Sequence, residues 1–97
     1  MVAIHWTEEA QVWLKDIHSY IAQDNKKVAS RVTNEIFNKT QILSSFPKIG
    51  YQYQNDDELD IRVLLYGHYR IAYLIKNEKH IDILGVFHGS LDIERYL

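Results

Sequence analysis

The fold is decided by residues 59–87, which read LDIRVLLY (59–66), GH (67–68), YRIAYLI (69–75), KNEK (76–79) and HIDILGVF (80–87). The three longer segments are rich in Ile, Val, Leu and Tyr, which favour β-strands. Gly67-His68 is typical of a two-residue hairpin connection, and the polar segment 76–79 is a slightly longer one. Residues 59–87 therefore predict three consecutive antiparallel strands.

Alternation along a strand assigns side chains to opposite faces of this sheet. In the first strand one face is predicted to hold Leu59, Ile61, Val63 and Leu65, and the other Asp60, Arg62, Leu64 and Tyr66. In the last strand one face is predicted to hold Ile81, Ile83, Gly85 and Phe87, and the other His80, Asp82, Leu84, Val86 and His88. One face of the sheet is thus apolar enough to cover helices.

The segment before the sheet predicts a short strand and two helices. Residues 2–6 alternate as a half-buried strand does, and Thr7 followed by Glu8 and Glu9 is a typical N-cap with acidic residues in the first helical turn. Apolar residues then recur at helical spacing over two stretches, Ala10, Trp13, Leu14, Ile17 and Ile21, and then Val28, Ala29, Val32, Ile36, Phe37 and Leu43. The polar link 22–25 is so short that the two helices must form an antiparallel hairpin.

Phe46-Pro47-Lys48-Ile49-Gly50 ends the second helix, which is predicted to run to about Ser45, and a loop follows to about Glu58. Residues 91–97 are expected to form a short helical tail capped by Ser90. The prediction is a single α+β domain over residues 1–97 with the order β-α-α-β-β-β. Its helical hairpin packs on one face of a mainly antiparallel four-stranded sheet that the first strand rejoins.

Composition narrows the function. The 97 residues are 46% hydrophobic, which is enough for one core, and the formal net charge of −2 argues against a surface that holds nucleic acid by general phosphate attraction. No cysteine is available for a disulfide or a thiolate, and the five histidines show no metal-ligand spacing. No stretch has the length of a signal core or a membrane span, so we expect a cytoplasmic protein without a metal or cofactor.

The order and spacing of several segments resemble the toxins of the RelE/ParE superfamily, and more closely its ParE-like branch. The segments are WTEEA (6–10), LKDI (14–17) with YIA (20–22), FPKIG (46–50), IRVL (61–64) running into YRIAY (69–73), and ILGVFHG (83–89) with Asp92. The resemblance covers nearly the whole chain. It implies the toxin of a bacterial type II toxin–antitoxin pair, bound and neutralised by a cognate antitoxin in a hetero-oligomer.

The resemblance also implies two possible targets. ParE-like toxins poison DNA gyrase without known hydrolytic chemistry, whereas RelE-like toxins enter the ribosome and cut mRNA. Metal-independent RNA cleavage needs a base, a cation for the phosphorane and an acid. Arg70 matches the arginine of the RelE-type Tyr-Arg pair, and His88 lies where some relatives place an acid or base. With Arg62 and Tyr96 these residues form the candidate catalytic set for an endoribonuclease.

We favour the ParE-like interpretation for two reasons. The positions at which RelE-like toxins carry lysines are occupied by Ile61 and Val63 in this chain, and the position after His88 is Gly89 rather than an arginine. A third possibility is a non-toxic module that only binds an antitoxin. A structural reading of the candidates also stands: Arg62 and Arg70 can pair with Asp60, Asp82 or backbone carbonyls across the sheet, and His88 can be a hydrogen-bonded structural histidine. Trp6 and Trp13 are expected to be core residues.

Overall fold

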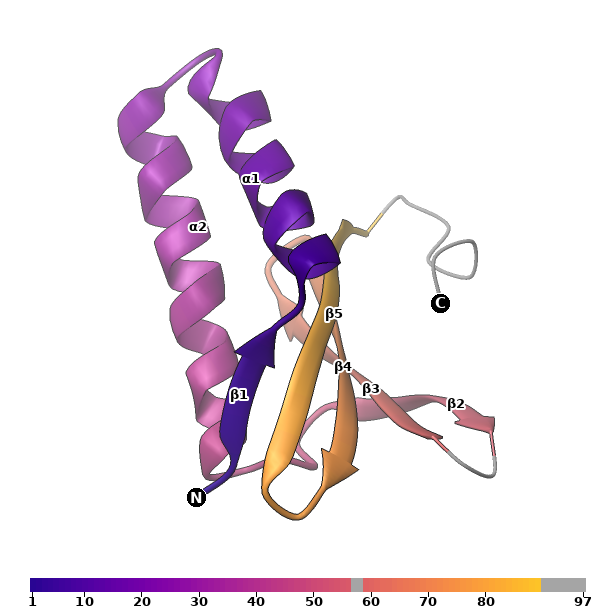
Figure 1. The fold of residues 1–97 in the computed structure, drawn as a ribbon. Coiled ribbons are helices and arrows are strands. Elements are labelled where there is room, and N and C mark those ends of the chain that lie inside the picture. The colour runs from indigo at the N-terminus through magenta and orange to yellow at the C-terminus, as the bar shows by residue number, and fades with distance from the viewer. Residues whose placement is uncertain (57–58, 90–97) are drawn as a thin grey trace.

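The structure is a computed structural model that describes residues 1–56 and 59–89, apart from the side chains of residues 54–56. Its elements are β1 (Ala3–Trp6), α1 (Glu8–Ala22), α2 (Lys26–Thr40), the 3₁₀ turn η1 (Gln41–Ser44), β2 (Tyr51–Asp56), β3 (Leu59–Tyr66), β4 (Tyr69–Asn77) and β5 (His80–His88). The strands form one sheet in the order β1-β5-β4-β3-β2, in which β1 runs parallel to β5 and the other pairs are antiparallel. Figure 1 shows the helical hairpin on one side of this sheet.

The α+β class, the helical hairpin and the three consecutive strands are confirmed, but the sheet has five strands where four were expected. The additional strand is β2, in a segment predicted to be loop. It pairs with β3 from Tyr51 opposite Val63 to Asp56 opposite Leu59, with a bulge between Gln52 and Gln54. β2 is an edge strand of mainly polar residues, which a hydrophobic pattern detects poorly. The expected tail over 91–97 lies outside the described residues.

Hydrogen bonds at the start of α1 fix the hairpin to the sheet. The Thr7 hydroxyl accepts a hydrogen bond from the Ala10 amide at 3.1 Å, as an N-cap does, and donates one to the Ile83 carbonyl at 2.8 Å. The Asn25 side chain caps α2 in the same way, accepting from the Val28 amide at 3.1 Å. Thr7 thus anchors α1 on β5, on which the helix packs.

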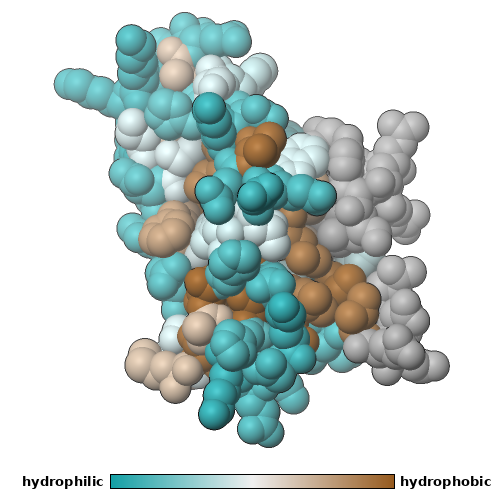
Figure 2. All heavy atoms as spheres, in the orientation of Figure 1, coloured by the Kyte–Doolittle hydropathy of each residue, from teal (hydrophilic) through white to brown (hydrophobic). Residues whose placement is uncertain are grey.

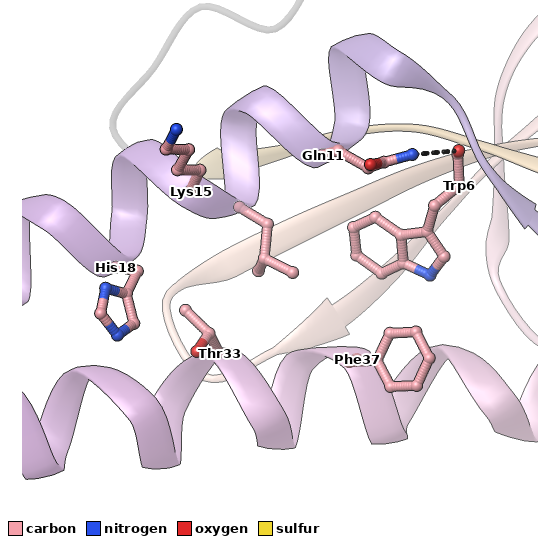
Figure 3. A pocket seen from close by; sticks show the side chains of 7 residues that line it. Trp6, Gln11, Lys15, His18, Thr33 and Phe37 are labelled. Carbon is pink, nitrogen blue, oxygen red and sulfur yellow. Dashed lines mark hydrogen bonds between the residues drawn. The ribbon is translucent and has the colours of Figure 1, made fainter.

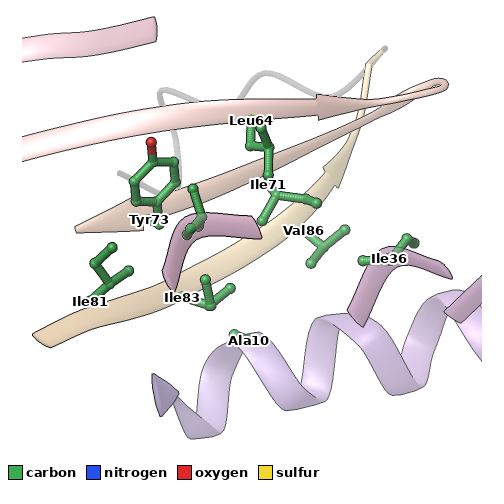
Figure 4. Close-up of a cluster of buried hydrophobic side chains, with 9 residues drawn as sticks. Ala10, Ile36, Leu64, Ile71, Tyr73, Ile81, Ile83 and Val86 are labelled. Atoms are coloured by element: carbon green, nitrogen blue, oxygen red, sulfur yellow. The ribbon is translucent and has the colours of Figure 1, made fainter. Parts of the chain in front are cut away.

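The main core lies between the helices and the sheet (Figure 4). Helical residues meet strand residues here, and the fully buried members include Ala10, Ile36, Leu43, Ile71, Tyr73, Ile81, Ile83 and Val86. A second, smaller cluster of Val63, Ala72 and Phe87 lies on the opposite side of the sheet, which we call the far face. Burial on both faces explains why the strands of this hairpin sheet are so apolar.

The side chains in the second half of β5 were assigned to the wrong faces of the sheet, because the strand contains a bulge. Tyr73 pairs with Ile83 and Ala72 with Gly85, which leaves Leu84 as the additional residue. After this bulge the alternation is shifted, because one extra residue moves every following side chain to the other face. Val86 therefore joins the main core, and Phe87 lies in the far-face cluster.

Candidate functional site

Arg62, the first candidate residue, has its polar groups bonded within the protein. Its Nε donates to the Asp60 carboxylate at 3.0 Å, and one terminal nitrogen donates to the carbonyl oxygens of Lys48 and Gly50 at 3.2 and 3.0 Å. The side chain is only 14% exposed. The structure therefore gives Arg62 the framework contacts that were weighed against a catalytic role.

Arg70 lies on the far face of the sheet. It stands directly opposite Phe87 on β5 and Leu65 on β3, and opposite residues of adjacent strands share a face. Arg62 is opposite Tyr73, a main-core residue, and so belongs to the face that carries the helices. The sheet thus separates the two arginines.

His88 is exposed at the end of β5, on the helix-bearing face opposite Tyr69. Its ring meets the Tyr69 ring edge-on with centroids 5.8 Å apart, and stacks with the His68 ring at 6.2 Å. Along β4 the position of His88 is four residues from that of Arg62, or about 13 Å. Arg62, Arg70 and His88 therefore do not converge on one reacting atom, while Tyr96 lies outside the described residues.

The part of the chain that the structure describes contains no set of side chains that could bind a metal ion. No three His, Asp or Glu side chains there are grouped so that they could hold a metal ion. Neither α1 nor α2 has the length and apolar composition that a membrane-spanning helix needs.

Among the grooves beside α1 in the described part of the chain, two are lined by residues of more than one element. The first, the edge groove, lies between α1 and the ends of β4 and β5, and its lining is Trp13, Asp16, Ile17, Tyr20, Tyr69, Val86 and His88. The Trp13 ring meets the Phe87 ring edge-on at a centroid distance of 4.7 Å. Because Phe87 is on the far face, Trp13 reaches past the border of β5, where β1 no longer pairs.

The second groove, the hairpin groove, lies between α1 and α2 and is lined mainly by apolar atoms. Its lining is Trp6, Gln11, Leu14, Lys15, His18, Thr33 and Phe37 (Figure 3). Trp6 and Phe37 stack with centroids 5.9 Å apart, and the Gln11 amide donates to the Trp6 carbonyl at 3.0 Å. The Trp6 indole N–H is buried and meets no acceptor among the described residues. A buried donor without an acceptor is costly.

The two tryptophans were expected to be core residues, and the structure corrects this prediction. Trp6 and Trp13 pack against the core but are only half-buried, and each lines a groove. Tyr20 and Phe37 were predicted to be helical residues without a functional role, and they are 76% and 44% exposed. Large aromatic side chains beside an apolar helical stripe are a signal that could have identified them.

Comparison with known proteins agrees with this architecture. Residues 4–93 match the family described as "ParE toxin of type II toxin-antitoxin system, parDE". A solved structure, "Chromosomal ParDE TA system from P. aeruginosa", superposes with a TM-score of 0.71 and 18% sequence identity, covering 91% of this chain and 96% of that one. No curated protein sequence matches significantly. The chain belongs to the ParE toxin family and is the toxin of a type II toxin–antitoxin pair, with a cognate antitoxin as its partner.

Proposed function

We propose that this toxin arrests bacterial growth by poisoning DNA gyrase without hydrolytic chemistry of its own. The observation that supports this proposal most is the separation of the candidate catalytic residues. Arg62 is bonded to Asp60 and to two backbone carbonyls, Arg70 lies on the other face of the sheet, and His88 is remote from Arg62. RNA cleavage requires such groups around one phosphate.

Charge supports the same proposal. A protein that docks on ribosomal RNA gains affinity from clustered Lys and Arg, and this chain has 11 of them against 13 Asp and Glu. A protein target such as gyrase makes no comparable demand for positive charge. Gyrase acts on DNA in the bacterial cytoplasm, which is the compartment we assign to the toxin.

We further propose that the antitoxin neutralises the toxin by laying an apolar segment into the hairpin groove. Phe37 and Trp6, which stack on each other, offer apolar surface there. Lys15 and His18 at the same groove suit acidic residues beside the apolar ones. Amphipathic segments recognise apolar grooves in this way.

Inducing the chain alone in bacteria tests the proposal. We expect growth arrest with DNA breaks and a DNA-damage response, and recovery when the antitoxin is co-expressed. Arrest with cut ribosome-bound transcripts and intact DNA would instead identify a RelE-type endoribonuclease. Normal growth at confirmed expression of the folded protein would identify a non-toxic antitoxin-binding module.

A further inference from the structure

The segment from Phe46, which follows η1, to Tyr51, the first residue of β2, is held by hydrogen bonds from the sheet, and we call it the 46–51 loop. The hydroxyl of Tyr73, a fully buried residue of β4, donates to the Pro47 carbonyl at 2.8 Å and accepts from the Gly50 amide at 2.9 Å. Arg62 donates to the carbonyls of Lys48 and Gly50. Side chains of β3 and β4 thus hold the loop backbone by hydrogen bonds.

The loop is also tied at its first residue. The Phe46 amide donates to the Ile42 carbonyl at 2.9 Å, and the Ile49 amide donates to the Phe46 carbonyl at 3.2 Å. Gly50 is required at the tightest point, because a Cβ there would lie 2.7 Å from both the Tyr73 hydroxyl and the Val63 carbonyl. The loop backbone is therefore hydrogen-bonded at nearly every residue.

This hydrogen-bonded loop exposes large apolar side chains. Phe46 is 59% exposed, Ile49 52% and Tyr51 47%, and Phe46 and Ile49 line a shallow depression with Pro47 and Lys48. Hydrophobic side chains also show at the surface in the lower half of Figure 2. Side chains on a preorganised backbone lose little entropy on binding. Large side chains of this kind, aromatic ones above all, are common at the centres of protein interfaces.

Two lysines lie at the same end of the molecule as these side chains. The Val2 amide donates to the Ser44 carbonyl and the Ala3 amide to the Lys79 carbonyl, which places Lys79 at this end. Lys48 is part of the loop itself, and Glu78 is an acid in the adjacent turn. These three side chains together carry one net positive charge, in a chain of net charge −2. Exposed apolar side chains with lysines nearby are complementary to an apolar pocket with acidic groups at its rim.

We infer that the 46–51 loop is the surface with which the toxin engages its protein target, and that the target presents an apolar pocket with an acidic rim. The inference rests on the proposed function, since it requires that the chain acts on a protein. No residue of the loop lines the hairpin groove or the edge groove. Target binding and antitoxin binding are thus assigned to separate surfaces.

The test uses the full chain with Phe46→Ser, Ile49→Ser and Lys48→Glu, and with Val12→Ser as a control. Val12 is 58% exposed, as Phe46 is, but lies on α1. Growth arrest tests the loop whatever the target is, and inhibition of purified gyrase tests the proposed target. Circular dichroism and thermal melts establish that each variant is folded.

We expect each loop variant to need at least about tenfold more toxin for half-maximal gyrase inhibition and to lose growth arrest, with antitoxin affinity within about twofold of wild type. Val12→Ser should match wild type. Loop variants as toxic as wild type, an equal loss in Val12→Ser, or a parallel loss of antitoxin affinity would each overturn the inference. So would loop variants that lose binding to phosphatidylglycerol vesicles alone, because the loop would then contact lipid. Wild-type arrest without gyrase inhibition refutes the gyrase target and leaves the loop to be judged by arrest, and no wild-type arrest overturns both.

Discussion

The hydroxyl of Tyr73 lies 2.8 Å from the carbonyl oxygen of Pro47, although 26 positions separate the two residues. The same hydroxyl accepts from the Gly50 amide, so one phenol satisfies a donor and an acceptor of the 46–51 loop. Tyr73 also contributes its ring to the main core. The central strand β4 therefore packs against the helices and fixes the loop with the same side chain.

Replacing Tyr73 by Phe keeps the ring and removes both hydrogen bonds. We expect the free energy of unfolding to fall by about 1–3 kcal/mol, because a buried amide and a partly buried carbonyl lose their partner. Urea denaturation measures this loss, and hydrogen exchange at the Gly50 amide should become faster. An unchanged stability together with unchanged exchange would show that Tyr73 does not hold the loop.

Alkaline pH should destabilise the protein through the same residue. Burial is the largest cause that raises the pKa of Tyr73 above 10.0, and the Gly50 hydrogen bond opposes it. Since the folded pKa exceeds the unfolded one, the stabilisation is complete below about pH 10 and is lost as pH rises through the folded pKa. Urea denaturation between about pH 8 and about pH 11 should show a steeper loss for wild type than for Tyr73→Phe. Tyr66, whose pKa is also raised, chiefly by its hydrogen bond to Glu35, should continue to titrate in the variant.

Gly50→Ala should destabilise the protein by about 1–3 kcal/mol, because the added Cβ would overlap the Tyr73 hydroxyl and the Val63 carbonyl. Gly67→Ala is the matched control. Its Cβ would meet no atom within 4 Å, and its φ of +55° costs an alanine about 1 kcal/mol. Thermal or urea denaturation compares the two. A larger effect at Gly67 than at Gly50 would contradict the tight packing beneath the loop.

His88→Ala and Arg70→Ala separate the two toxin mechanisms. For a gyrase poison, His88→Ala should keep growth arrest and neither variant should alter the cellular transcripts. For an endoribonuclease, both should lose transcript cutting by about 100-fold or more, because each would remove a group from the reaction. Sequencing of transcript 5′ ends after induction measures this directly.

The hairpin groove predicts where antitoxin affinity is lost. Phe37→Ala removes exposed apolar surface stacked on Trp6. We expect the antitoxin to bind about tenfold more weakly by calorimetry, since an aromatic anchor at an interface contributes about 1–2 kcal/mol. Growth arrest by the variant alone should be unchanged. Full antitoxin affinity would exclude Phe37 from the interface.

The elements that the sequence predicted well are those with strong local signals. Thr7 and the acidic residues after it mark the start of α1, and Gly67-His68 marks the β3–β4 turn. β2 was missed because an edge strand can be polar, and its pairing with β3 is long-range information. The faces of β5 changed at Leu84 because a bulge depends on the register of two strands, which one strand's pattern does not contain.

The candidate site was less predictable. The sequence named Arg62, Arg70 and His88, but only the register of β3, β4 and β5 shows that they occupy separate places. The framework contacts of Arg62 include Lys48 and Gly50, more than ten residues away in a loop without regular structure. Proline and glycine in that loop predicted a turn, not a surface held by Tyr73.

Gyrase poisoning is tested by a supercoiling and DNA-cleavage assay of purified gyrase with the purified wild-type toxin. We expect loss of supercoiling and accumulation of gyrase-dependent cleaved DNA, both reversed by adding the cognate antitoxin. Unimpaired supercoiling at a large molar excess of folded toxin, with no cleaved DNA, would contradict the claim that this chain poisons gyrase.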